Sequence, residues 1–166
     1  MKKNKNFFTI IEFIMVITII GILILLILPR IKVVYSIKLQ GAIKRLVQDI
    51  KYTQTVAITN HTDYGISFNP AENSYQAYQV SGGNLLKDPY THQPLVVDFD
   101  EISQYRGINI NSADFGGTNI LQFNWRGNPC DGNGNPLTRE GRIILSYHDE
   151  SFTIIVSPQT GNIEIQ

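Results

Sequence analysis

The chain has 166 residues, which is enough for one modest domain with an appendage and too few for two ordinary domains. Lys and Arg together number 14, as do Asp and Glu, so the net charge gives no global sign of a nucleic-acid-binding protein. The charge is divided unevenly, because residues 1–51 carry nine basic and two acidic groups and residues 52–166 carry five basic and twelve acidic groups. A single cysteine, Cys130, excludes an intramolecular disulfide and a zinc site built from several thiolates.

An apolar run occupies residues 8–28, behind a short stretch with three lysines, and its only charged residue is Glu12. As a helix, these 21 residues span about 31 Å, the thickness of the hydrocarbon core of a bilayer. The lysines favour a cytoplasmic N-terminus, which places everything after Pro29 on the far side of the membrane. The sequence therefore predicts a single-pass transmembrane helix over residues 8–28 and an exported head.

Two general explanations of this run are less satisfactory. A cleaved secretory signal has a shorter apolar core followed by a site of small residues, and the chain has neither. A plain signal anchor accounts for the length and the lysines but leaves Glu12 unexplained, because a carboxylate in an apolar run costs free energy unless it has a partner. Near the end of the helix, Glu12 could also simply reach the membrane interface.

The segment from Phe8 to Glu12, with the sequence Phe-Thr-Ile-Ile-Glu, and a proline seventeen residues later resemble the N-terminus of type IV pilins and pseudopilins. The resemblance implies that a prepilin peptidase removes a leader of residues 1–7 by cutting between Phe7 and Phe8, and that the new amine of Phe8 is methylated. The family has a glycine before the cut, where this chain has Phe7. The resemblance also implies that Glu12 neutralises the N-terminal ammonium of a neighbouring subunit in a filament core and so sets the register of assembly.

Residues 29–60 are predicted to continue the helix in amphipathic form and to dock on the head. Pro29 lacks an amide hydrogen and clashes with the preceding turn, so we expect it to kink or locally melt the helix. Asn60 is a plausible end of the helix. Apolar residues at helical spacing form one stripe: Ile43, Leu46, Val47, Ile50, Ala57 and Ile58. Basic residues are spread over the other faces without interleaved aromatic rings, which is typical of a solvated or headgroup-facing flank: Lys38, Lys44, Arg45 and Lys51.

Residues 61–166 show short alternating or apolar runs separated by turn residues, the pattern of an antiparallel β domain. The expected strands are 64–68, 75–80, 95–99, 107–110, 120–125, 142–147, 152–157 and 162–165. Turn residues at 69–73, 148–150 and 158–161 separate neighbouring strands. The predicted fold class is α+β, with a long N-terminal transmembrane and amphipathic helix packed on an antiparallel β head.

The head resembles the GspH/FimT family of minor pilins and pseudopilins at three places: the helix end 46–52 with 57–60, the turn 123–127, and the closing hairpin from 152–156 to 160–163. The resemblance implies a subunit that assembles through its helix into a type II secretion pseudopilus or a type IV pilus and initiates or caps the filament. Its implied partners are other pilins, the prepilin peptidase, the inner-membrane assembly platform and the membrane.

Two alternatives remain: a DNA-binding minor pilin of natural transformation and an uncleaved, membrane-anchored periplasmic protein. Some DNA-uptake pilins carry a Gly-Arg-x-Arg motif in the C-terminal strand. The matching residues 161–164 lack both arginines and add Glu164, so nucleic acid is the weaker hypothesis.

Other chemistry finds little support in the sequence. Residues 131–135 have oxygen ligands at alternating positions, as in a calcium loop, but Pro136 and Arg142 occupy positions that need glycine and a bidentate glutamate. The three histidines, His61, His92 and His148, lack metal-ligand spacing.

No motif of a catalytic serine, a catalytic thiol or a phosphate-binding loop is present, so we predict no metal, no cofactor and no enzymatic activity. The large aromatic residues Trp125 and Tyr147 are expected to pack in the core or between sheets.

Overall fold

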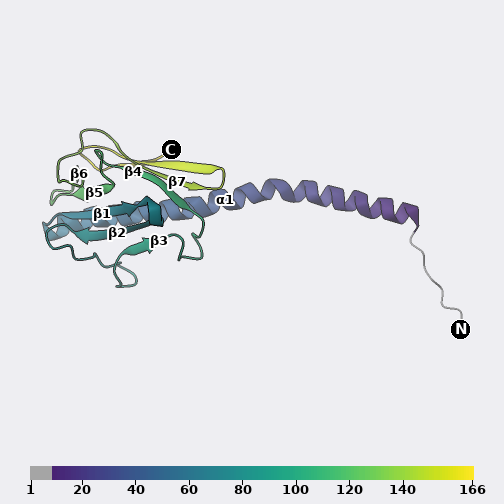
Figure 1. Cartoon of the computed structure of the whole chain (residues 1–166), viewed down its shortest axis with the longest axis horizontal. Helices are drawn as coiled ribbons and strands as arrows, with labels where there is room; N and C mark the ends of the chain where they lie inside the picture. Colours follow the sequence, from purple (N-terminus) through teal and green to yellow (C-terminus); the bar gives the residue numbers. More distant parts are fainter. Residues whose placement is uncertain (1–8) are drawn as a thin grey trace. The chain divides into compact units, whose positions relative to one another are not determined.

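The structure is a computed structural model that describes residues 9–166, without the side chains of residues 25–34. The chain forms two compact units, one up to Tyr35 and the other from Ser36 to Gln166. Helix α1, Ile10–Asn60, begins in the first unit and ends in the second (Figure 1). The predicted leader 1–7 and the predicted processing site at Phe7 and Phe8 lie outside the described residues.

The predicted helix is confirmed, and its last residue is Asn60 as expected. The helix continues through Pro29 without interruption, so the expectation of local melting there is wrong. A proline removes only its own amide donor, and the hydrogen-bonded turns on either side can still close. Within the described residues, no helix is both long and apolar enough to cross a membrane.

The C-terminus of α1 is closed by two hydrogen bonds of the Schellman type. The amide of Thr62 donates to the carbonyl of Ala57 at 3.2 Å, and the amide of His61 donates to Ile58 at 3.4 Å. His61 has a φ of 50°, the left-handed conformation that the residue after such a helix must adopt. This geometry turns the chain sharply from the helix into the first strand.

The second unit carries two antiparallel sheets (Figure 1). The first has the order β3-β2-β1-β5-β6 and the second the order β4-β7-β8-β9. The strands of the first sheet are β1 (Tyr64–Asn69), β2 (Ser74–Gln79), β3 (Val96–Asp98), β5 (Ile120–Phe123) and β6 (Pro129–Cys130). The strands of the second are β4 (Asn109–Asp114), β7 (Gly141–Tyr147), β8 (Glu150–Val156) and β9 (Ile163–Ile165). A short 3-10 helix, η1 (Pro70–Glu72), joins β1 to β2. The predicted α+β fold is confirmed.

Several details of the strands differ from the prediction. Strand β5 ends at Phe123, before the predicted end at 125, and β8 begins at Glu150, before the predicted start at 152. Strand β4 begins at Asn109 and runs to Asp114, later than the predicted 107–110, because Gly107 has a φ of 88° that no regular strand accommodates. Strand β6 was not predicted. It has only two residues and begins with Pro129, and a proline in so short a segment is typical of a turn.

The core lies between the docked half of α1 and the sheets. The helix buries Leu39, Ala42, Ile43, Leu46, Ile50 and Ala57 within the same apolar cluster as the inward-facing residues of the strands. The predicted stripe is thus confirmed for its central members, and Val47 is partly buried. Ile58 is an error in the prediction, since 45% of it is exposed. It lies two turns after Lys51, on the face of the helix that points away from the core.

Candidate assembly site

The N-terminal half of α1 exposes its apolar side chains. Every residue from Ile10 to Ile24 is exposed in the structure. The large apolar ones are Ile10, Ile11, Phe13, Ile14, Met15, Val16, Ile17, Ile19, Ile20, Ile22, Leu23 and Ile24. Apolar surface left in water costs about 25 cal/mol per Å² relative to burial, and a continuous surface of this kind marks an interaction site. This half of the helix therefore needs an apolar partner on all its faces.

Glu12 takes part in a capping box with Thr9 at the start of the helix. Glu12 Oε2 accepts hydrogen bonds from the Thr9 amide and the Thr9 hydroxyl, both at 3.2 Å. In return, the Glu12 amide donates to the Thr9 hydroxyl oxygen at 3.3 Å. Thr9 and Glu12 thus satisfy two backbone donors that the first turn leaves open, and the negative charge is favourable at the positive end of the helix dipole. Sequence reasoning missed this role, although a Thr three residues before a Glu at the start of an apolar run is its signature.

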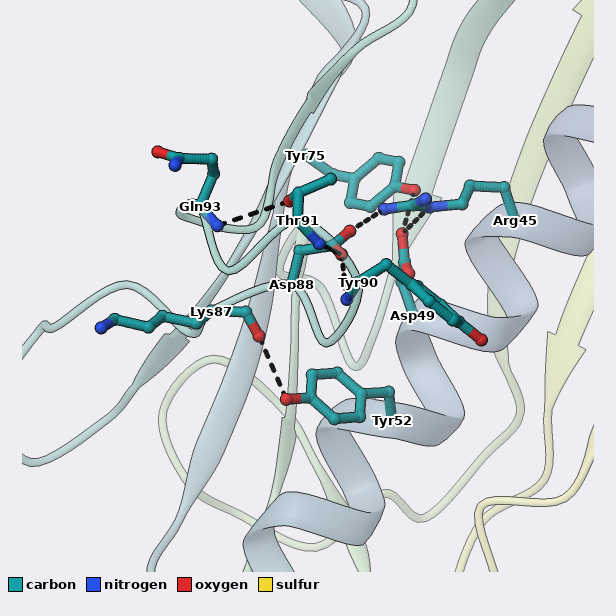
Figure 2. Close-up of polar contacts among 9 residues, drawn as sticks. All are labelled: Arg45, Asp49, Tyr52, Tyr75, Lys87, Asp88, Tyr90, Thr91 and Gln93. Carbon is teal, nitrogen blue, oxygen red and sulfur yellow. Dashed lines mark hydrogen bonds and ion pairs between the residues drawn. The ribbon is translucent and has the colours of Figure 1, made fainter.

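Polar contacts in the second unit fasten the chain between β2 and β3 to α1 (Figure 2). The guanidinium of Arg45 donates from Nε to Asp49 Oδ2 at 2.9 Å and from a terminal nitrogen to Asp88 Oδ2. The hydroxyl of Tyr75, on β2, donates to the same Asp49 oxygen at 2.7 Å. Arg45 therefore joins the helix to the loop, and the Asp49 carboxylate joins the same guanidinium group to the strand.

Asp88 is also held by its own loop. Its Oδ1 accepts the backbone amides of Tyr90 at 2.8 Å and Thr91 at 3.0 Å (Figure 2). The hydroxyl of Tyr52, farther along α1, donates to the carbonyl of Lys87 at 3.0 Å. The loop is thus fixed to the helix at Arg45 and at Tyr52, which are about two turns apart.

The pKa values of the two carboxylates in this cluster are shifted in opposite directions. Burial raises the pKa of Asp49, and the hydrogen bonds from Tyr75 and Arg45 only partly offset that increase. Desolvation would also raise the pKa of Asp88, but the amides of Thr91 and Tyr90 and the Arg45 guanidinium outweigh it and lower the pKa. Burial also raises the pKa of the Tyr75 hydroxyl, so it remains the donor to Asp49. The groups are mutually satisfied, and we assign the cluster to stability.

The residues considered for metal binding are not brought together. The three histidines have exposed side chains, and each has a left-handed backbone conformation. Asp131 Oδ1 accepts the amides of Asn133 and Asn135, both at 2.9 Å, and these bonds lower the pKa of Asp131. In the described part of the chain, no three His, Cys, Asp or Glu side chains could hold a metal ion.

The large aromatic residues follow the prediction only in part. Tyr147 is partly buried and packs against the core. Trp125 is 46% exposed, so its predicted place in the core is wrong. It is the second residue after the end of β5 and lies in the turn to β6, outside the alternation that directs side chains inward.

No protein-family model and no curated protein matches the chain. Among solved structures, the chain is similar to the minor pseudopilin EpsH from the type 2 secretion system of Vibrio cholerae. The TM-score is 0.57 at 12% sequence identity, and the match covers 78% of this chain and 96% of that one. It is also similar to the type IV minor pilin FimU of Pseudomonas aeruginosa, with a TM-score of 0.50, 16% identity and coverage of 77% and 87%. At such low identity the likeness is one of fold, and the chain has the fold seen in this minor pseudopilin and this minor pilin.

Proposed function

We propose that the chain is a minor pilin or pseudopilin, a non-enzymatic subunit that assembles through its N-terminal helix into a type II secretion pseudopilus or a type IV pilus and initiates or caps the filament. One observation carries the proposal: a helix half with exposed apolar side chains is attached to a head unit that has the fold of EpsH and FimU. The partners of this role are other pilins, the prepilin peptidase and the inner-membrane assembly platform.

The exposed helix half needs an apolar environment both before and after assembly. We propose that lipid surrounds residues 8–28 while the subunit is stored in the inner membrane, with the head on the periplasmic side. Neighbouring helices would replace the lipid in the filament. Because every face from Ile10 to Ile24 is apolar except at Glu12 and two small positions, Thr18 and Gly21, the same surface suits either environment.

Glu12 is proposed to serve two purposes after the leader is removed. Both hydrogen bonds that the Glu12 carboxylate accepts in the capping box go to Oε2, which leaves Oε1 to accept the methylated ammonium of Phe8 from a neighbouring subunit. The pairing would offset two charges that are costly in an apolar filament core.

Processing is tested by the intact mass of the protein extracted from the membranes of its own host. We expect the loss of residues Met1 to Phe7 and the gain of one methyl group on Phe8. A full-length mass would contradict the processing step and favour an uncleaved, membrane-anchored protein. This measurement comes first because Phe7 stands directly before the proposed cut, where the pilin family has a glycine.

Assembly is tested by separating the two purposes of Glu12. Glu12→Gln keeps an acceptor for the capping box but removes the charge, so we expect its recovery in sheared filaments to fall by about tenfold, as does that of Glu12→Ala. Thr9→Ala weakens the cap and keeps the charge, and it serves as the matched control with nearly normal recovery. Recovery of Glu12→Gln at the level of the unaltered protein would rule out charge pairing.

A further inference from the structure

The docked half of α1 turns one stripe of side chains away from the head. Successive residues of an α-helix are about 100° apart, so these exposed side chains fall within a wedge of about 80°. The buried residues of the same segment lie on the opposite side of the helix. We call the following residues the outer stripe: Ile37, Lys44, Gln48, Lys51, Thr55 and Ile58. The stripe lies wholly within the second unit and runs for about 31 Å along the helix.

The two ends of the outer stripe are apolar. Ile37 is 64% exposed and Ile58 is 45% exposed. A contact that covered either isoleucine would remove apolar surface from water, which is favourable. Between them, exposed residues recur at steps of three and four, the spacing of the ridges with which one helix packs into the grooves of another. The shape of the stripe therefore fits a helix that lies along it.

The middle of the outer stripe is basic. Lys44 and Lys51 are exposed, and neither takes part in an ion pair among the described residues. They are seven residues apart, so both ammonium groups project on the same side of the helix, about 10 Å apart along its axis. The carboxylates of Asp49 and Asp88, which lie beside this part of the helix, are both paired with Arg45. No residue of the stripe is acidic, so its two positive charges need a partner that supplies the carboxylates.

The same charges disfavour a second copy of this chain as the occupant. Two copies that packed through their outer stripes would bring four ammonium groups into one contact without a carboxylate between them. Like charges at an interface are costly, and they are a means by which a surface rejects the wrong partner. A stripe that repels itself suits a subunit whose neighbours are different chains.

We propose that the outer stripe binds a helix of a different pilin or pseudopilin subunit. Carboxylates of that helix face Lys44 and Lys51, and its apolar side chains cover Ile37 and Ile58. The inference rests on the proposed function, because that function supplies other pilins as neighbours. The charges select the partner, since a neighbour without carboxylates would leave two ammonium groups partly desolvated and unpaired.

A photo-cross-link from the middle of the stripe tests the identity of the occupant. Gln48 is exposed and lies between the two lysines, so it is replaced by p-benzoylphenylalanine in the full-length chain in the membranes of its host. We expect an adduct with a different pilin or pseudopilin, joined through a helical segment that contains carboxylates. An adduct of twice the mass of this chain would show a second copy and overturn the inference. The absence of any adduct from recovered filaments would also overturn it, because the stripe would then face solvent.

Charge reversal tests the chemistry of the contact. Lys44→Glu combined with Lys51→Glu should reduce both the adduct and the recovery in sheared filaments by about fivefold. Lys44→Arg combined with Lys51→Arg keeps both charges and should preserve the adduct and the recovery. Arg139→Glu combined with Arg142→Glu is the matched control, because it makes the same change of charge at two exposed arginines outside the helix and should leave both readouts unchanged. An unaltered unfolding midpoint, followed by Trp125 fluorescence, shows that each variant keeps its fold.

The outcomes separate this inference from the proposed function. If the unaltered chain enters filaments and Lys44→Glu with Lys51→Glu enters them equally well, the helix contact is overturned and the proposed function stands. If the unaltered chain itself is not recovered in filaments, the proposed function is contradicted. Replacement of the carboxylates in the cross-linked segment of the partner by lysine should restore the adduct of the charge-reversed variant. A failure to restore it would overturn the pairing of charges.

Discussion

The two halves of α1 differ in where their apolar partners are. Residues 36–60 bury one stripe against the strands of the same unit and direct Lys44 and Lys51 to solvent. Residues 10–24 expose nearly uniform apolar surface. An amphipathic helix finds its partner within the chain, whereas a helix that is apolar on every face needs a partner outside it. The boundary near Tyr35 thus separates a part of the helix that packs within its own unit from a part whose described apolar side chains are exposed.

The largest expected effect compares one isoleucine from each half. Ile50 is fully buried, so Ile50→Ala should lower the free energy of unfolding of the head by about 3 kcal/mol through lost burial and the cavity left behind. Ile17→Ala removes a side chain that touches no core residue and should leave that free energy unchanged. Denaturant unfolding in detergent, followed by Trp125 fluorescence, measures both. Similar losses for the two variants would contradict the proposed division.

The next effect tests the polar cluster of the docked half. Arg45→Met removes the guanidinium from two carboxylates whose side chains are almost fully buried. We expect a loss of about 2 kcal/mol, less than for a fully buried ion pair because about a third of the Arg45 side chain is exposed. Lys44→Met, one residue earlier on the outer face, is the matched control and should change stability by less than about 0.5 kcal/mol. Equal losses of stability for Arg45→Met and Lys44→Met would show that the ion pairs of the cluster do not stabilise the fold.

A smaller effect concerns how the stability of the fold changes at acidic pH. The pKa of Asp88 lies below its usual value of 3.8 in the folded state, so its ionised form stabilises the fold above that value, and the contribution is lost as the pH falls through the lowered pKa. Asp49 has a raised pKa and acts in the opposite direction, because its protonation stabilises the folded state relative to the unfolded chain. Asp88→Asn should cost about 1 kcal/mol at neutral pH and flatten the acid limb of the stability profile. An unchanged acid limb would contradict this role of Asp88.

The smallest effect lies at the start of the exposed, N-terminal half of α1. Thr9→Ala removes the hydroxyl of the capping box and should cost the first turn of α1 up to about 1 kcal/mol. Faster hydrogen exchange at the amides of residues 10–13 would report it. Thr9→Ser retains the hydroxyl and should exchange at the original rate. Equal exchange rates for the alanine and serine variants would show that the cap is not formed in solution.

Much of the fold could be predicted from the sequence because its signals are local. The helical spacing of Ile43, Leu46 and Ile50 identifies the docked stripe, and alternating runs identify most strands. The free half of α1 follows from the apolar run itself. Strand β6 escaped prediction because a two-residue strand is defined by its pairing with β5, which no local pattern reveals.

The polar cluster and the exposed tryptophan could not be predicted for a different reason. Arg45 and Asp88 are 43 residues apart, and nothing in the sequence near either residue specifies the other. Trp125 was expected in the core because large aromatic residues are usually buried, but its turn is fixed by bonds to Asn124 and Asp63 that hold it outside. The capping box was within reach of sequence reasoning, since Thr9 and Glu12 are local neighbours.

The spacing of the contacts along the docked half of α1 has a mechanical consequence. Lys38, Arg45 and Gln54 tie the helix to the head at separate points, and Gln54 donates to the carbonyls of Gly127 and Thr160 at 2.8 and 3.1 Å. A pull along the helix axis would therefore load all of these points in shear at once, instead of peeling them off one after another. Tension on the exposed half of α1 would reach the head through the contacts of Lys38, Arg45 and Gln54 acting in parallel. Together these contacts would withstand a force that would break any one of them alone.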